Sequence, residues 1–248
     1  MQCIRNHGNA VLRLTIGEAE SNPFPLNFRR TGNFMPNPHV LMFINCSLSP
    51  SPEALVHYFQ AQQKAQKEGI DSTFSIMKMT ASPYLAINSV CHTLLAEPKF
   101  THLMITSDDT VCDDDLIIKL VNDDKDIVSG VYRTRDAMTN GLAVYGLPGE
   151  NFDEWMKAGA LVERKYSNSQ SMTIKREVIE KVVEAHPELD FLSETGETVH
   201  GIWMPYIKDK RIYCDDWAFC QRATDLGFKC WIDFNVKLAH KCDIWLGC

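Results

Sequence analysis

The sequence predicts an α/β protein built around a mostly parallel sheet. Short apolar runs alternate with amphipathic, helix-like segments from residue 40 to residue 132, which is the pattern of successive βα units. Ser-Pro pairs stand where two of the helices should begin. With 248 residues and 45% hydrophobic content, the chain can bury a full core in a single domain.

The first half of the chain justifies this fold class element by element. The expected order is a strand at 40–44, a helix from Ser51 to a stop at Gly69, a strand at 73–79, a helix from Ser82 to Pro98 and a strand at 102–105. Because consecutive βα units cross over with one hand, we expect these strands to lie parallel in one sheet.

Acidic residues follow the strand at 102–105. Ser107, Asp108 and Asp109 fall in the turn after it, and Asp113 opens a short helix that leads to another apolar strand at 126–132. Ligands of open α/β sheets bind beyond the carboxyl ends of strands, so carboxylates there are placed to hold a divalent cation and, through it, a phosphate. We interpret the later run 113–115 as a helix cap instead.

A second acidic pair stands at the start of a predicted helix near the C-terminus. Asp215 and Asp216 open it, and Gly227 ends it. Backbone donors at a helix start can aim a carboxylate, and burial against Trp217 would raise its basicity. The alternative is a pair that only caps the helix.

A histidine ends the last predicted strand. His240 follows the alternating run 236–239. Alone, such a residue is interpreted as an ordinary hydrogen-bonding side chain, whereas beside Asp108 it would be a second metal ligand. Oxygen and imidazole ligands together suit Mn²⁺ and Mg²⁺.

These motifs, in this order, resemble glycosyltransferases of the GT-A fold, in particular the family-2-like group. The resemblance rests on the acidic turn, the strand DIVSGVY, the helix DDWAFC and the terminal histidine, and it covers roughly residues 40–241. It implies a Rossmann-like three-layer α/β/α sandwich around a mostly parallel central sheet. The family's DxD motif aligns with Thr106-Ser107-Asp108, so its first Asp is missing here.

The resemblance also implies roles for particular residues. Asp216 would be the base that takes a proton from the acceptor hydroxyl, with Asp215 in place of the family's Glu. Asp108 and His240 would ligate Mn²⁺ or Mg²⁺, with Asp109 as the substitute carboxylate. The remaining assignments are Ser107, Asp109, Asn45 and Asn88 for the nucleotide sugar, and Gln170, Trp203 and Trp217 for the acceptor. Trp203 is equally open to interpretation as a core residue.

The function expected from this resemblance is transfer of a sugar from a nucleoside diphosphate sugar to a hydroxyl. The acceptor remains open among a glycan, a lipid-linked sugar, a protein, a small molecule and a hydroxymethylated DNA base. Two alternatives remain as well. One is a related nucleotidyltransferase, and the other is a degenerate relative that only binds nucleotides or glycans, which the missing first Asp favours.

Composition limits the partners and the compartment. A net charge of −7 disfavours general nucleic-acid binding. Nine cysteines without a CxxC pair indicate reduced thiols and hence a cytoplasmic protein, and no apolar run approaches the roughly 20 residues that span a bilayer. Residues 1–39 are expected to form an irregular extension before one catalytic domain, whose nucleotide half covers about 40–133 and whose acceptor half covers about 134–248.

Overall fold

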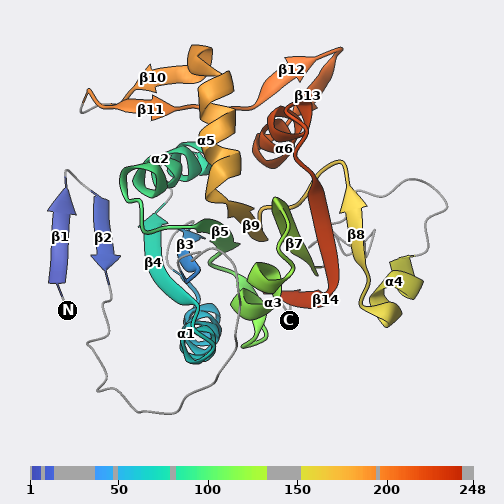
Figure 1. Cartoon of the computed structure of the whole chain (residues 1–248). Helices are drawn as coiled ribbons and strands as arrows, with labels where there is room; N and C mark the ends of the chain where they lie inside the picture. Colours follow the sequence, from blue (N-terminus) through green and yellow to red (C-terminus); the bar gives the residue numbers. More distant parts are fainter. Residues whose placement is uncertain are drawn as a thin grey trace, which may run out of the picture.

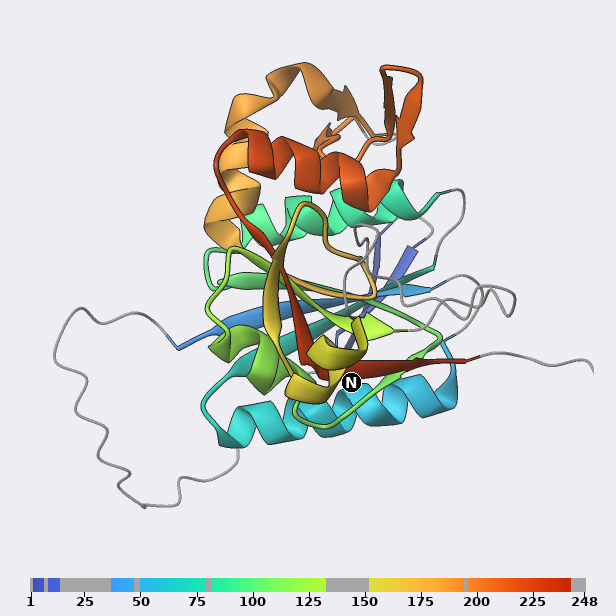
Figure 2. The ribbon, with the colours of Figure 1, turned by 90° about the vertical axis from the view of Figure 1, so that its right-hand side faces the viewer.

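The predicted α/β architecture is confirmed. A computed structural model describes residues 2–6, 9–13, 37–46, 50–78, 82–132, 152–193 and 196–241. Helices cover both faces of a central eight-stranded sheet (Figures 1 and 2). Among the described residues, no helix combines the length and the apolar character needed to cross a membrane.

Five strands of the central sheet run in one direction, and three run against them. The strand order is β4-β3-β5-β9-β7-β14-β6, with β8 paired to β14. The five that share a direction are β3 (His39–Cys46), β4 (Asp71–Lys78), β5 (His102–Ser107), β7 (Ile127–Tyr132) and β14 (Cys230–His240). The three that oppose them are β6 (Thr110–Cys112), β8 (Leu161–Arg164) and β9 (Ser171–Lys175). The sequence did not predict that an antiparallel β9 separates β5 from β7.

Two hydrophobic cores hold the helices to the sheet. One face carries α2 (Pro83–Ala96), α5 (Arg176–Ala185) and α6 (Asp215–Asp225), and the other carries α1 (Pro52–Lys67) and α3 (Leu116–Asn122). The short α4 (Phe152–Ala158) packs against β14 through Trp155 and Phe234. Burial of apolar side chains at about 25 cal/mol per Å² makes these two layers the main source of stability.

Local signals explain where the helices begin and end. The Ser51 hydroxyl accepts a hydrogen bond from the Ala54 N–H at 3.2 Å and caps α1, which has Pro52 as its first residue. Gly69 after α1 and Gly227 after α6 have φ of +79° and +93°, a conformation that glycine adopts without a steric penalty.

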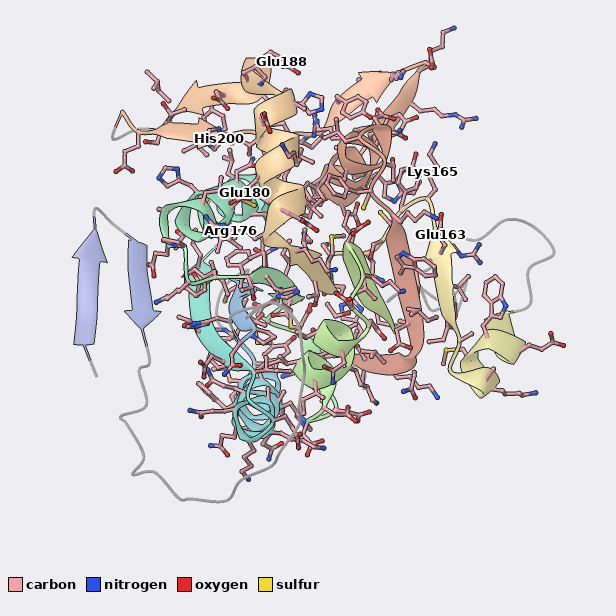
Figure 3. All side chains as sticks on the ribbon, in the orientation of Figure 1. Glu163, Lys165, Arg176, Glu180, Glu188 and His200 are labelled. Atoms are coloured by element: carbon pink, nitrogen blue, oxygen red, sulfur yellow. The ribbon has the colours of Figure 1, made fainter. Side chains whose placement is uncertain are left out.

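Arg176 joins two of these helices. Its guanidinium donates to the carbonyls of Leu94, Leu95, Glu97 and Phe100 at 2.7 to 3.2 Å, so the first residue of α5 caps the C-terminus of α2. Glu180, one turn further along α5, accepts from its Nε at 2.6 Å (Figure 3).

Small antiparallel hairpins complete the described structure. Residues 2–6 and 9–13 form β1 (Gln2–Asn6) and β2 (Asn9–Arg13), which corrects the expectation of an irregular extension for this part of residues 1–39. The other hairpins are β10 (Asp190–Leu192) with β11 (Thr198–His200), and β12 (Tyr206–Lys208) with β13 (Arg211–Tyr213). A short 3₁₀ turn, η1 (Pro187–Leu189), precedes β10.

Candidate functional site

The sheet edge at the carboxyl ends of the parallel strands gathers several of the predicted residues. Asn45 of β3 lies in register with Ser107 of β5, and Thr106 of β5 pairs with Ser171, the residue after Gln170. Asn45, Ser107 and Gln170 therefore lie at the same end of three adjacent strands, with Gln170 just before β9. This is the edge where open α/β sheets bind their ligands.

The backbone of the acidic turn is fixed on both sides. The Asp108 N–H donates to the Asn45 carbonyl at 3.1 Å, and the Ser51 N–H donates to the Asp108 carbonyl at 3.0 Å. These bonds tie the turn to the end of β3 and to the start of α1. Only 7% of Asp108 is exposed. The turn is thus a held element of the edge rather than a loose loop.

Tyr58 of α1 supports the same turn from inside the protein, a contact that was not predicted from the sequence. Its hydroxyl donates to the Ser107 carbonyl at 2.8 Å and lies 2.6 Å from the Thr110 hydroxyl. The ring is fully buried, and burial raises the pKa of its phenol well above the ordinary value. The one indication in the sequence was the hydroxyl group of Tyr58, a polar group on the inward-facing side of the predicted helix.

The structure pairs His240 with Asp109. The imidazole Nε2 lies 3.4 Å from the Asp109 carboxylate, and the Lys241 N–H donates to the Asp109 carbonyl at 2.8 Å. Antiparallel pairing of β14 with β6 places His240 opposite Thr110, one residue beyond Asp109. The Ser107 hydroxyl also donates to the Asp109 carboxylate. The Tyr132 ring meets the imidazole edge-on at 5.5 Å between centroids.

This arrangement bears on the predicted ligand set for a metal. The sequence paired Asp108 with His240 and named Asp109 as the substitute carboxylate, and the structure places the Asp109 carboxylate beside the His240 imidazole. Thr106, at the first position of the motif, donates its hydroxyl to the Phe43 carbonyl in the core at 3.1 Å and supplies no ligand. No group of three candidate ligands occurs among the described residues.

A divalent cation fits the Asp109–His240 pair as a site with two protein ligands. An oxygen and an imidazole nitrogen form a donor set that Mn²⁺ accepts readily. With so few protein ligands, water and substrate phosphate oxygens would fill the other coordination positions, as is usual where a cation is shared with a nucleotide.

The acidic pair opens α6 at the same edge of the sheet, the one formed by the carboxyl ends of the parallel strands. The helix begins at this edge because it runs back to the opposite edge, where β14 starts (Figure 2). The Asp216 N–H donates to the Asp215 carboxylate at 3.0 Å, and the Trp217 N–H donates to the Asp216 carboxylate at 2.8 Å. Both carboxylates are therefore aimed by backbone donors of the first turn.

The two acids differ from ordinary surface carboxylates. Burial, and then the neighbouring charge of Asp215, raises the pKa of Asp216 to about 7, although the Trp217 N–H opposes the rise. Burial also raises the pKa of Asp215. A carboxyl group with a pKa near neutrality can both take up and release a proton at physiological pH.

A short segment before β9 connects α6 to the sheet edge. The Tyr166 ring stacks on Trp217, with 4.9 Å between centroids and 8° between planes. The Asn168 amide nitrogen donates to the carbonyl of Gly130 in β7 at 2.9 Å, and the Asn168 side-chain oxygen accepts from the Gln170 N–H at 3.2 Å. The acidic pair and the acidic turn thus lie at two ends of one connected edge.

Two predicted contacts belong to the core instead. Asn88 is fully buried, and its side-chain oxygen accepts from the Trp203 N–H at 3.0 Å. Trp203 is fully buried as well and stacks on Phe219 at 4.4 Å. Neither residue has exposed surface with which to meet a nucleotide or a sugar, so burial favours the core interpretation that the sequence had left open for Trp203.

Asn45 and Gln170 keep unused hydrogen-bonding capacity. The side-chain oxygen of each is buried and has no partner among the described residues. A buried polar atom without a partner costs about 1 to 3 kcal/mol, so such atoms at a ligand-binding edge are suited to a bound polar group.

Comparisons with known proteins concern the fold. No protein-family model matches the sequence, and no curated protein does. Among solved structures, A197 from STIV is similar with a TM-score of 0.50 and 15% identity over 83% of this chain and 86% of that chain. GalNAc-T7 with UDP, GalNAc and Mn²⁺ gives 0.43 and 6% over 82% of this chain and 43% of that chain. The inositol-1-phosphate CTP transferase from T. maritima gives 0.38 and 10% over 84% and 91%.

The architecture therefore defines the class of fold. Three layers, five strands in one direction and an edge with acidic residues fit a GT-A-like, Rossmann-type α/β fold. At 15% identity, the similarity to A197 concerns the fold alone.

Proposed function

We propose that the protein is a glycosyltransferase that moves a sugar from a nucleoside diphosphate sugar to an acceptor hydroxyl. The observation that carries the proposal is Asp216, a carboxyl group with a pKa of about 7 that backbone donors hold at the start of α6. It stands at the start of α6, at the edge formed by the carboxyl ends of the parallel strands, and the Asp109–His240 pair lies at this edge too. A base and an anion-neutralising site are the two groups that such a transfer requires.

Asp216 acts on the acceptor. In its ionised form it takes the proton of the acceptor hydroxyl, whose oxygen attacks the anomeric carbon of the sugar while the bond to the diphosphate oxygen breaks. Trp217 follows Asp216 in the first turn of α6, and Gln170 lies further along the connected edge. Both side chains would orient the acceptor. Burial, and after it the neighbouring charge of Asp215, raises the pKa of Asp216 to about 7, so that the base exchanges between its two forms near neutral pH.

The donor lies at the other end of the edge. Asp109 and His240 would hold Mn²⁺ or Mg²⁺, with Asp108 in the same turn. A bound divalent cation neutralises charge that develops on the leaving diphosphate. Ser107 and Asn45, adjacent in register, would contact the nucleotide through backbone and amide groups.

A second candidate is a relative that binds nucleotides or glycans without turnover. The observation in its favour is Thr106, which places a core hydrogen bond where the family's motif has a carboxylate. Measured turnover separates this candidate from the first.

The test is a panel of sugar nucleotides, each with Mn²⁺ and with chelator, read by release of free nucleoside diphosphate. The proposal expects one or a few donors to be consumed, and it expects the same nucleoside diphosphate with Mn²⁺ to stabilise the fold. At about 100 times the dissociation constant, a ligand adds roughly 2.7 kcal/mol, or about 5 to 10 °C in Tm. Binding without release would favour the second candidate. If uridine, guanosine, cytidine and thymidine diphosphates do not bind, and none of them is released from its sugar nucleotide, both candidate functions are contradicted.

A further inference from the structure

The hairpin formed by β12 and β13 projects beyond the α6 layer (Figures 1 and 2). Asp209 and Lys210 form its turn, with φ of +52° and +62°. Tyr206 pairs with Tyr213, Ile207 with Ile212, and Lys208 with Arg211. Directly opposed residues of an antiparallel pair share one face, and the faces alternate along the strand. The hairpin therefore has an isoleucine face and a tyrosine–cation face.

The isoleucine face is open to solvent. Ile207 is 76% exposed and Ile212 is 63% exposed, and the two side chains stand opposite each other. A single exposed apolar side chain is ordinary on a protein surface, but a paired apolar face at the end of a projecting element is suited to a partner.

The hairpin is also the site of a local positive charge on an acidic protein. Lys208, Lys210 and Arg211 are all exposed, and Asp209 is the one carboxylate among them, so two net positive charges lie within four residues. The chain as a whole carries −7. This local reversal of charge favours an anionic partner.

Aromatic contacts fasten the hairpin to the domain. The Tyr206 and Tyr213 rings stack at 4.7 Å with 7° between planes, and the Arg222 guanidinium of α6 lies 5.1 Å from the centre of the Tyr206 ring. Arg222 also donates to the carbonyls of Ile202 and Met204 at 2.8 and 2.9 Å, ahead of β12. The hairpin is thus held in place and presents its isoleucine face outward.

We propose that this hairpin docks the protein on the surface of an anionic lipid bilayer. Ile207 and Ile212 enter the boundary between headgroups and acyl chains. Lys208 and Arg211 leave the opposite face of the two-stranded hairpin beside its turn, and their long side chains reach past its edges to lipid phosphates, together with Lys210 of the turn. An apolar face with cations on the neighbouring residues of both strands matches the two layers of such a surface. The hairpin lies next to the start of α6, so docking would bring the candidate base toward the membrane. The proposal does not depend on sugar transfer.

The test is co-sedimentation of the full chain with phosphatidylcholine vesicles that contain phosphatidylglycerol, compared with vesicles of phosphatidylcholine alone. Binding is expected only to the anionic vesicles, and added salt should weaken it. Each cation near an anionic surface contributes about a fivefold gain in affinity, so changing Lys208, Lys210 and Arg211 together to Gln should lower binding by about two orders of magnitude. Changing Ile207 and Ile212 to Ser should lower it as well.

Leu192→Ser is the matched control. Leu192 is 71% exposed on the neighbouring hairpin, which carries Asp190 and Glu197 rather than cations (Figure 3 labels His200 on the same hairpin). This variant should bind vesicles like the wild type. Circular dichroism and Tm verify that every variant is folded. No binding to anionic vesicles at low salt, or equal binding by all variants, would overturn the proposal. A dimer that the isoleucine changes abolish, without vesicle binding, would assign the face to a second copy of the chain and also overturn it.

Discussion

Replacing Asp216 by Asn should stabilise the fold in a manner that depends on pH. The amide keeps an oxygen that accepts from the Trp217 N–H but removes the charge of this half-buried side chain. The pKa of Asp216 rises from 3.8 to about 7 on folding, which corresponds to about 4 kcal/mol of destabilisation once the group is ionised in both states. The variant also loses a favourable charge at a helix start, which offsets up to about 1 kcal/mol of this gain. The net increase in its free energy of unfolding is therefore about 3 kcal/mol.

The sign follows from the direction of the shift. Because the folded-state pKa is raised, the wild-type stability attached to Asp216 is fully present below about pH 4 and is lost as the pH rises to about 7. The asparagine at this position in the variant cannot ionise, so the variant keeps this stability over the whole pH range. Its Tm should equal that of the wild type at pH 4 and exceed it by about 6 to 12 °C at pH 8, at 2 to 4 °C per kcal/mol for a chain of this size.

The assay is a series of thermal melts from pH 4 to pH 9 for both proteins. Asp225→Asn, at the exposed far end of the same helix, is the matched control and should gain no more than about 1 kcal/mol, the amount by which the helix dipole disfavours a carboxylate there. A constant difference in Tm at every pH, or a less stable variant at pH 8, would show that partial burial does not destabilise the ionised form of Asp216.

Three further predictions concern other parts of the edge and the scaffold. Asp109→Ala should abolish the Mn²⁺-dependent part of the stabilisation by nucleoside diphosphate, whereas an unchanged shift would exclude the Asp109–His240 pair as the metal site. Arg176→Lys keeps the charge but loses the fork that bonds four carbonyls, so urea unfolding should reveal a loss of about 2 to 4 kcal/mol; a loss below 1 kcal/mol would show that water replaces the guanidinium. Gly130→Ala should cost about 1 to 3 kcal/mol in the same assay, because a Cβ would lie 2.6 Å from the Val236 carbonyl oxygen, and a neutral result would require β14 to shift.

Local patterns predicted the elements that carry the site. The apolar runs before Ser107 and His240 end where β5 and β14 end, and the start of α6 falls on the acidic pair as expected. These features depend on neighbouring residues in the sequence, such as caps, glycine stops and alternation. They are therefore readable from a single chain.

Long-range pairing could not be predicted in the same way. The contact between Asp109 and His240 depends on β6, a strand of three residues that leaves no periodic signal, and on its antiparallel register with β14. The insertion of β9 between β5 and β7 likewise depends on contacts between residues that are distant in the sequence. Trp203 looked equally suited to core or ligand because an indole serves both, and only its burial decides between them.

The most direct test of Asp216 as the catalytic base is the rate of nucleoside diphosphate release from the accepted sugar nucleotide. The wild type and Asp216→Asn are measured in parallel with saturating donor and acceptor. If Asp216 is the base, the variant should be slower by about two to four orders of magnitude while its donor affinity is unchanged, and Asp215→Asn should be affected less. The wild-type rate should rise with pH through about 7, where Asp216 ionises. Equal turnover by the wild type and the Asp216 variant would contradict the assignment of Asp216 as the base.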